Sequence, residues 1–350
     1  MSALENNNNE NILQVRDLKK YYPVGIKEGR RQFLKAVDGV SFDIKRGTTM
    51  GLVGESGCGK TTVGRTILRL HDVTGGDVFF DGHNLAELKT RELRKLRPRM
   101  QMIFQDPYSS LSPRMPVGEI IGEAVKEHNI VPKSEYNQYV RSVMEACGLP
   151  TSYASRYPHE FSGGQRQRIC IARAVALKPD FIICDEPVSA LDVSIQAQII
   201  NLLQDLQSEF GYTYLFISHD LSVVEHISDT IGVMYLGSLV EAGDKDKIFK
   251  RPMHPYTQAL LSAVPVSDPD MMTDRVILEG DIPSPVNPPS GCKFRTRCRY
   301  AMDVCAKVVP DFIEYEPNHK VACHLYPQLS LDNSKGEKSE QSIARSRTSA

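Results

Sequence analysis

The sequence lacks any hydrophobic run long enough to cross a lipid bilayer. A spanning helix needs about 18 to 20 consecutive apolar residues, and no window of the 350-residue chain approaches that length. Residues 1–13 also lack the basic start and the apolar core of a secretory signal. From these two absences we expect the chain itself to be cytosolic.

The sequence also has almost no net charge. Its 42 basic side chains balance 43 acidic ones and leave a formal charge of −1. Because dedicated nucleic-acid-binding proteins usually carry a basic excess, this balance argues against a nucleic-acid partner. Charged residues make up 24% and hydrophobic residues 41%, which excludes collagen-like, mucin-like and wholly disordered classes.

Short β-like runs alternate with segments of helical periodicity along most of the chain. Several of the runs are almost continuously apolar, as expected of parallel strands that are covered on both faces. The expected strands are 13–18, 50–53, 100–104, 181–184, 213–217 and 231–235. The expected helices are 61–70, 165–177, 195–210 and 221–227. This alternation predicts an α/β fold.

Composition divides the chain into four parts. We expect a disordered tail, a large α/β domain, a C-terminal extension and a second disordered tail at 1–11, 12–265, 266–330 and 331–350. Both tails contain too few apolar residues to offset the entropy of ordering. Within the large domain, a composition rich in helix formers predicts a helical insertion at about 107–178. The proline-rich run 281–291 predicts an extended linker rather than a packed element.

A glycine-rich loop follows the expected strand 50–53 and precedes a helical pattern. All eight positions of a P-loop motif are matched, by Gly54, Glu55, Ser56, Gly57, Cys58, Gly59, Lys60 and Thr61, and Thr62 follows them. The glycines let successive backbone N–H groups face inward as an anion nest, to which the helix N-terminus adds partial positive charge. We expect Lys60 to reach the β- and γ-phosphates, Thr61 to ligate Mg²⁺, and Thr62 to lie at the α- and β-phosphates.

Two acidic residues end the apolar run 181–184. Asp185 is suited to the Mg²⁺ shell, and Glu186 lies one residue beyond, where the strand opens toward the phosphates. Glu186 is therefore the candidate general base for an attacking water molecule. Taken alone, an apolar run that ends in two acids is weak evidence for a nucleotide site, and the P-loop earlier in the chain makes it strong evidence.

Two further polar residues follow expected strands. Because parallel strands of such folds end at one ligand-binding edge, His219 could contact a γ-phosphate. Gln105 ends the strand before the helical insertion, where its amide could ligate Mg²⁺ weakly and respond to movement of the insertion.

A second glycine-bearing turn precedes the helix that begins near residue 166. It consists of Ser162, Gly163, Gly164 and Gln165, with Ser162 at an N-cap-like position. One nucleotide does not need two phosphate cradles. We therefore predict that this turn serves the γ-phosphate of a nucleotide held by a second subunit, in a head-to-tail ATPase dimer closed by ATP.

Taken in order, these motifs resemble the nucleotide-binding subunit of an ABC transporter. The resemblance spans most of 13–264 and includes the run 189–192, which ends in Asp192 and would connect the two ATP sites. It also implies that Tyr22 stacks on adenine, with the adjacent Tyr21 as the alternative. The second turn is preceded by Phe161, where many members of the family have leucine.

The run 251–261 and the proline- and cysteine-rich segments after it are similar to the C-terminal extension of dipeptide and oligopeptide importer ATPases. The run 104–113 is also typical of that group. In that family, two different ATPase subunits pair beneath two transmembrane permease subunits, and an extracytoplasmic peptide-binding protein delivers the substrate. The resemblance implies an ATPase at the cytoplasmic face of the inner membrane that powers peptide uptake.

Other interpretations of the resemblance stay open. Nickel and glutathione importers share the same architecture. The partner ATPase could also be a second copy of this chain. A soluble ABC ATPase acting on DNA or ribosomes is an alternative of another class, although the sequence shows neither the long coiled-coil insertion nor the second cassette typical of those proteins.

Eight cysteines in a cytosolic chain are not expected to form disulfides. Four are scattered through the first half of the chain, where we expect them to behave as small hydrophobic residues. The other four lie in one C-terminal stretch: Cys292, Cys298, Cys305 and Cys323. Their spacing differs from that of a zinc knuckle, whereas four thiolates can hold a [4Fe–4S] cluster. Because some peptide-importer ATPases carry such a cluster, the resemblance favours iron–sulfur. Zinc and four reduced thiols are the alternatives, with His319 or His324 as a possible fourth ligand.

Overall fold

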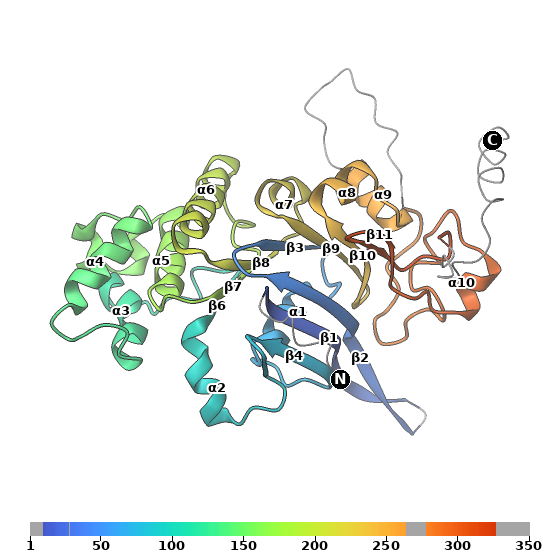
Figure 1. Cartoon of the computed structure of the whole chain (residues 1–350), viewed down its shortest axis with the longest axis horizontal. Helices are drawn as coiled ribbons and strands as arrows, with labels where there is room; N and C mark the ends of the chain where they lie inside the picture. Colours follow the sequence, from blue (N-terminus) through green and yellow to red (C-terminus); the bar gives the residue numbers. More distant parts are fainter. Residues whose placement is uncertain (1–9, 28, 264–277, 327–350) are drawn as a thin grey trace, which may run out of the picture.

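The computed structural model describes residues 10–27, 29–263 and 278–326 (Figure 1). The expected disordered tails lie outside these residues, except that Asn11 already begins the first strand. In the described part of the chain, no helix is long and apolar enough to cross a membrane.

An eight-stranded mixed sheet runs through the centre of the molecule. Its strands are β3 (Thr49–Val53), β6 (Met100–Ile103), β7 (Phe181–Asp185), β8 (Thr213–Ile217), β9 (Thr230–Tyr235), β10 (Ser238–Asp244), β11 (Ile313–Glu316) and β12 (His319–Val321). They lie in the order β11-β12-β10-β9-β3-β8-β7-β6. The run from β9 to β6 is parallel, and β10, β12 and β11 add an antiparallel edge. All but the first of the expected strands lie in the parallel part.

Both faces of the parallel strands are covered. On β7, Ile182 and Cys184 pack into a core shared with the helices of one face. Phe181 and Ile183 pack into a second core on the opposite face. This two-sided burial explains why the strands are continuous apolar runs rather than alternating ones.

A second, antiparallel sheet packs over one face of the first. Its strands are β1 (Asn11–Lys27), β2 (Arg30–Lys45), β4 (Gly75–Phe80) and β5 (His83–Asn84), in the order β2-β1-β4-β5. Helix α1 (Lys60–Ile67) lies between the two sheets, where Val63 and Ile67 are fully buried. The sequence had predicted only 13–18 of this sheet.

The remaining helices lie on both faces of the central sheet and at both ends of the molecule (Figure 1). They are α2 (Thr90–Leu96), α3 (Val117–Glu127), α4 (Tyr136–Ala146), α5 (Gly163–Val175), α6 (Val193–Phe210), α7 (Leu221–Ile227), α8 (Lys245–Lys250), α9 (Pro255–Ser262) and α10 (Asp303–Lys307), with short 3₁₀ turns at Arg97–Arg99, Thr151–Ser155 and Pro158–Glu160. The four expected helices coincide with α1, α5, α6 and α7 to within a few residues.

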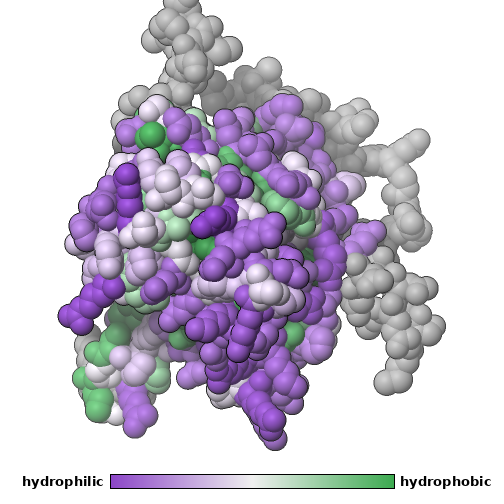
Figure 2. Space-filling view, turned by 90° about the vertical axis from the view of Figure 1, so that its left-hand side faces the viewer, coloured by the Kyte–Doolittle hydropathy of each residue, from purple (hydrophilic) through white to green (hydrophobic). Residues whose placement is uncertain are grey.

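Helices α3, α4 and α5 connect β6 to β7 and form a group at the left end in Figure 1, where the sequence predicted a helical insertion. Seen from that end, the surface is mainly hydrophilic, and its hydrophobic residues form small separate patches (Figure 2).

The C-terminal residues 278–326 are joined to the sheet rather than separate from it. Strand β12 pairs with β10, and Phe294 is buried in contact with Tyr235 and Tyr256, at ring-centroid distances of 5.2 and 5.4 Å. The proline-rich run forms neither helix nor strand, as expected of a linker. However, it is tied to the core, because the Lys35 N–H donates to the Pro285 carbonyl at 3.2 Å.

Candidate nucleotide-binding site

The glycine-rich loop connects the buried end of β3 to α1 and leaves no room for a side chain at two of its glycines. Gly54, Gly57 and Gly59 have φ values of +151°, +76° and +108°, in the left-handed region that favours glycine. A Cβ on Gly54 would lie 2.2 Å from the Met234 carbonyl oxygen, and one on Gly59 would lie 2.1 Å from that of Ala36. The glycines therefore allow this turn to pack tightly against neighbouring backbone.

The loop borders an open cavity of about 580 Å³. Of the residues singled out in the sequence, those that line it are Tyr22, Ser56, Gly57, Cys58, Gly59, Lys60, Thr61, Thr62, Gln105, Glu186 and His219. Motifs separated by up to about two hundred residues thus converge on one concave surface. Its other lining residues are Leu34, Lys35, Ala36, Leu236, Gly237 and Pro285, none of which the motifs indicated.

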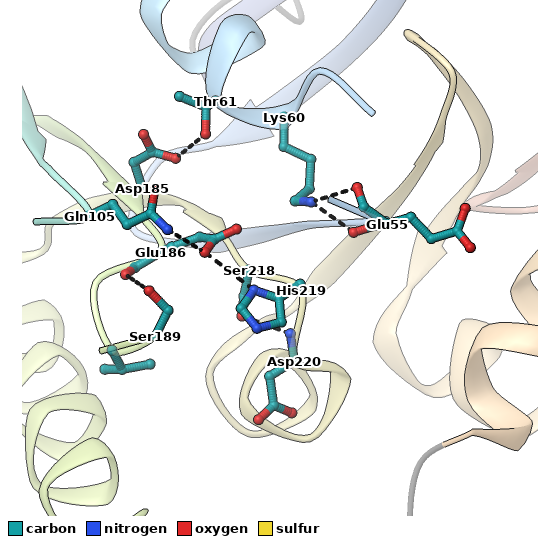
Figure 3. Close-up of polar contacts among 12 residues, drawn as sticks. Glu55, Lys60, Thr61, Gln105, Asp185, Glu186, Ser189, Ser218, His219 and Asp220 are labelled. Carbon is teal, nitrogen blue, oxygen red and sulfur yellow. Dashed lines mark hydrogen bonds and ion pairs between the residues drawn. The ribbon is translucent and has the colours of Figure 1, made fainter. Parts of the chain in front are cut away.

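Lys60 is almost completely buried at the base of the cavity. Its Nζ donates to the Gly54 carbonyl at 2.7 Å and to the Glu55 carbonyl at 3.2 Å (Figure 3). The ammonium is therefore held by the backbone of the same loop. A bound phosphate would give it a stronger, charge-assisted partner.

Thr61 and Asp185 form the centre of the expected magnesium site. The Thr61 hydroxyl donates to Asp185 Oδ1 at 2.7 Å. Asp185 is fully buried, its Oδ2 accepts no hydrogen bond from the described residues, and the guanidinium of Arg65 lies 4.0 Å from it. Burial raises the pKa of the Asp185 carboxyl, and the Thr61 hydrogen bond opposes that shift. A buried carboxylate oxygen without a donor beside a hydroxyl fits a hard divalent cation such as Mg²⁺.

Glu186 stands where three parallel strands end. Its Oε2 accepts from Gln105 Nε2 at 2.9 Å and lies 3.2 Å from His219 Nδ1 (Figure 3). Gln105 follows β6, Glu186 follows β7 and His219 follows β8, so the carboxyl ends of adjacent strands bring these side chains together. Glu186 itself has a φ of +47°, an uncommon conformation for a residue other than glycine, and its side chain is 14% exposed.

The two candidate adenine-stacking tyrosines have different environments. Tyr22 lines the cavity, with Lys20 Nζ 4.9 Å from its ring centroid. The hydroxyl of Tyr21 instead donates to Asp38 on β2. Only Tyr22 is thus placed to meet a ligand in the cavity.

The second turn and Asp192 lie outside this cavity. Ser162 caps α5, because its hydroxyl accepts from the Gln165 N–H at 3.4 Å and the Gln165 Oε1 accepts from the Ser162 N–H at 3.1 Å. Asp192 caps α6 by accepting from the Ile195 N–H at 3.0 Å. Gly164 lies against Ile195, where a Cβ would come within 2.5 Å. Ser162 and Asp192, which cap α5 and α6, are therefore neighbours on a part of the surface outside the nucleotide cavity.

The four C-terminal cysteines are near one another, but the expected metal site gains no support. Within 10–27, 29–263 and 278–326, no three His, Cys, Asp or Glu side chains are grouped so as to hold a metal ion. Burial raises the pKa of the Cys292, Cys298 and Cys323 thiols, the last to about 12. His319 bonds to Glu241 at 2.7 Å and His324 to the Val308 carbonyl at 3.0 Å. The described residues therefore give no support to the iron–sulfur or the zinc expectation.

Two protein families match separate parts of the chain. Residues 37–189 match the family described as ABC transporter, and residues 240–305 match the oligopeptide/dipeptide transporter C-terminal region. The first match contains the glycine-rich loop, Gln105, the second turn and Glu186. The second contains the cysteines at 292, 298 and 305.

Individual proteins match over nearly their whole length. The oligopeptide transport ATP-binding protein AppF of Bacillus subtilis is 54% identical over 324 residues, covering 91% of this chain and 98% of that protein. The dipeptide transport ATP-binding protein DppF of Escherichia coli is 49% identical over 331 residues, covering 94% and 98%. Among solved structures, the ATP-binding cassette MJ0796 in a dimeric post-hydrolysis state with ADP and Pi is 27% identical. It superposes with a TM-score of 0.60 and covers 67% of this chain and 98% of its own.

The geometry of the site and the matches to known proteins indicate the same family. The nucleotide loop, the acidic end of β7 and the histidine after β8 occupy one cavity, and the C-terminal region matches that of peptide transporters. The chain belongs to the ABC transporter family, as an ATP-binding protein of its oligopeptide and dipeptide branch.

Proposed function

We propose that this chain is the ATP-hydrolysing subunit of an importer that takes up dipeptides and oligopeptides. The observation that carries the ATPase part is the Glu186 carboxylate, held between Gln105 and His219 at the opening of the nucleotide cavity. The peptide substrate is supported by relatives named as oligopeptide and dipeptide transport proteins and by the matching C-terminal region.

The residues of the cavity have separate roles in hydrolysis. Lys60 leaves its two carbonyl partners for the β- and γ-phosphates, and the backbone N–H groups of the loop bind the remaining phosphate oxygens. Thr61 and Asp185 would hold Mg²⁺, which neutralises charge on the β- and γ-phosphates when it is bound. Tyr22 is placed to stack on the adenine.

Glu186 takes the proton of the attacking water at its carboxylate. Gln105 donates to the same carboxylate and fixes its orientation. His219, whose side chain is 56% exposed, is available to contact the γ-phosphate.

A second ATPase subunit would complete the site. Ser162, Gly163, Gly164 and Gln165 lie outside the cavity of their own chain, on an exposed surface beside Asp192. Their exposed helix N-terminus is suited to the γ-phosphate of a nucleotide bound by the partner. We propose that this partner is a related but different ATPase chain, so that the assembly is a heterodimer.

The helical group is the proposed contact with the membrane subunits. It carries an open groove of about 1130 Å³, lined by Met115, Glu119, Glu123, Lys126, Glu127 and Tyr136, among others. We propose that two permease subunits dock here, that an extracytoplasmic peptide-binding protein delivers the substrate, and that the chain lies at the cytoplasmic face of the inner membrane. Closure of the ATPase dimer would move this group and thereby the permeases.

The test of the substrate is reconstitution of the chain with its permeases, partner ATPase and binding protein in vesicles. We expect ATP-dependent accumulation of labelled dipeptide or oligopeptide that stops when Glu186→Gln replaces the wild-type chain. Nickel and glutathione are measured in parallel. Accumulation of either one without peptide uptake would contradict the peptide assignment.

A further inference from the structure

The C-terminal region reaches back to the nucleotide loop through one buried ion pair. Arg297 Nη1 and Nη2 donate to the two carboxylate oxygens of Glu55 at 2.9 and 3.1 Å. The Arg297 side chain is only 7% exposed and that of Glu55 is 24% exposed. The pair links residues 242 positions apart, one of them at the second position of the glycine-rich loop.

The same loop residue is held a second time. The Glu55 N–H donates to the hydroxyl of Tyr256 on α9 at 2.9 Å. Phe294 packs against Tyr256, and the Arg297 guanidinium lies 6.0 Å from the ring centroid of Tyr235. The start of the nucleotide loop is thus fixed by side chains of α9 and of residues 278–326.

The ion pair also determines where the Glu55 charge points. Figure 3 shows the Glu55 side chain directed away from Lys60, although the Glu55 carbonyl accepts from Lys60 Nζ. Removing Arg297 would leave a partly buried carboxylate without its cation within the glycine-rich loop itself. It could then turn toward Lys60 and compete with ATP phosphates for the same ammonium.

A structural role alone is a weaker explanation of this pair. Buried ion pairs contribute little net stability compared with apolar packing, because dehydration of both charges offsets their attraction. A bidentate pair does, however, specify one orientation of its partners. Because Glu55 lies on the loop that binds the phosphates of ATP, the orientation of its carboxylate affects nucleotide binding.

We propose that Arg297 is a positioning residue for the ATP site, through which the C-terminal region sets the affinity of the glycine-rich loop for ATP. It holds the Glu55 carboxylate outside the phosphate cradle and keeps Lys60 available. This inference rests on the proposed nucleotide site around Lys60.

The experiment measures Mg-ATP binding by titration calorimetry with the full-length chain, and KM and kcat for ATP in the assembled transporter. Arg297→Gln is compared with Arg297→Lys and with Arg295→Gln, a matched control whose guanidinium bonds to Ser290 within the C-terminal region. A fourth variant combines Arg297→Gln with Glu55→Gln. Circular dichroism at the assay temperature verifies that each variant is folded.

We expect Arg297→Gln to raise the Kd and KM for ATP about fivefold or more, with kcat nearly unchanged. Arg297→Lys should recover part of the loss. Adding Glu55→Gln should restore affinity because no carboxylate is left to compete, and Arg295→Gln should behave as wild type.

Wild-type affinity in folded Arg297→Gln would overturn the proposal, as would a double variant no better than the single one. If Arg297→Gln fails to fold, the folded Arg297→Lys variant decides: we expect a Kd between that of wild type and an increase of about fivefold, and a wild-type Kd would overturn the proposal. Lys60→Ala is measured alongside. Loss of binding there with no effect of Arg297→Gln refutes the coupling alone, whereas normal binding by Lys60→Ala refutes the nucleotide site itself.

Discussion

The Thr61 hydroxyl donates a 2.7 Å hydrogen bond to Asp185 Oδ1 and so joins the first turn of α1 to the end of β7. The contact joins residues 124 positions apart, one in the glycine-rich loop and one at the acidic end of β7. It orients one oxygen of a buried carboxylate and leaves the other without a donor in the described structure.

Replacing Thr61 with valine tests this link. Thr61→Val removes the hydroxyl from a fully buried carboxylate, so we expect a loss of about 1 to 3 kcal/mol in the free energy of unfolding. The Mg²⁺ concentration required for ATP hydrolysis should also rise. Thr61→Ser keeps the hydroxyl and should retain both properties. A valine variant with wild-type Mg²⁺ dependence would show that Thr61 is not a ligand.

Substitution of Lys60 should chiefly weaken nucleotide binding. Lys60→Ala removes the only cationic side chain of residues 54–62, so the Kd for Mg-ATP should increase strongly while the fold persists. Lys250→Ala removes an exposed lysine that pairs with Asp246 on α8 and serves as the control. Equal affinity of the two variants in calorimetry would count against the phosphate role of Lys60.

The glycines of the loop should differ in their tolerance of a methyl group. Gly59→Ala places a Cβ 2.1 Å from the Ala36 carbonyl oxygen, so backbone must move, and we expect both stability and ATP binding to be lost. Gly57→Ala meets no atom within 4 Å. It should cost only the strain of a positive φ, about 1 kcal/mol. Thermal unfolding of both variants, with and without Mg-ATP, measures the difference.

Acid should weaken the attachment of α9 through His254. Burial lowers the pKa of this histidine to about 4, well below the value of about 6.5 in an unfolded chain. The unfolded state therefore binds the extra proton first, and stability falls as the pH drops from about 6.5 toward 4, by up to about 3 kcal/mol.

Urea unfolding at pH 7 and pH 5 measures this effect. His254 caps α9 by accepting from the Tyr256 N–H at 3.1 Å, and asparagine can replace that cap. His254→Asn should therefore reduce the difference in unfolding free energy between the two pH values. An unchanged difference would assign the acid sensitivity to other groups.

The parallel core and most of the cavity could be predicted from the sequence because their signals are local. Strands covered on both faces are continuous apolar runs, and the loop motif has a fixed spacing. Gln105, Glu186 and His219 each follow such a run directly, so the rule that parallel strands end at one edge was sufficient to group them.

The second sheet, the C-terminal strands and the Glu55–Arg297 pair could not be predicted, because they depend on contacts between segments that are distant in the sequence. Strand β2 does show alternation, with Val40, Phe42 and Ile44 buried, but register shifts along the β1–β2 pairing break the period that would reveal the whole strand. The addition of β12 to β10 and the approach of Pro285 to the cavity leave no local pattern. Likewise, neither Glu55 nor Arg297 indicates its partner.

The metal site predicted from the four C-terminal cysteines gains no support in the described residues. Their clustering is real, but proximity in the sequence does not determine whether the side chains form a metal-binding group. In the described residues, Cys292 and Cys298 pack against the hydrophobic core.

The most direct test of the account is the turnover of Glu186→Gln. Because this change keeps the shape of the side chain and removes the base, we expect Mg-ATP binding to persist while the hydrolysis rate falls about a hundredfold or more. The nucleotide-bound dimer should also accumulate, as measured by size-exclusion chromatography with light scattering. Glu225→Gln, an exposed position on α7, is the matched control. Hydrolysis by Glu186→Gln at the wild-type rate would contradict the central claim that this carboxylate activates the attacking water.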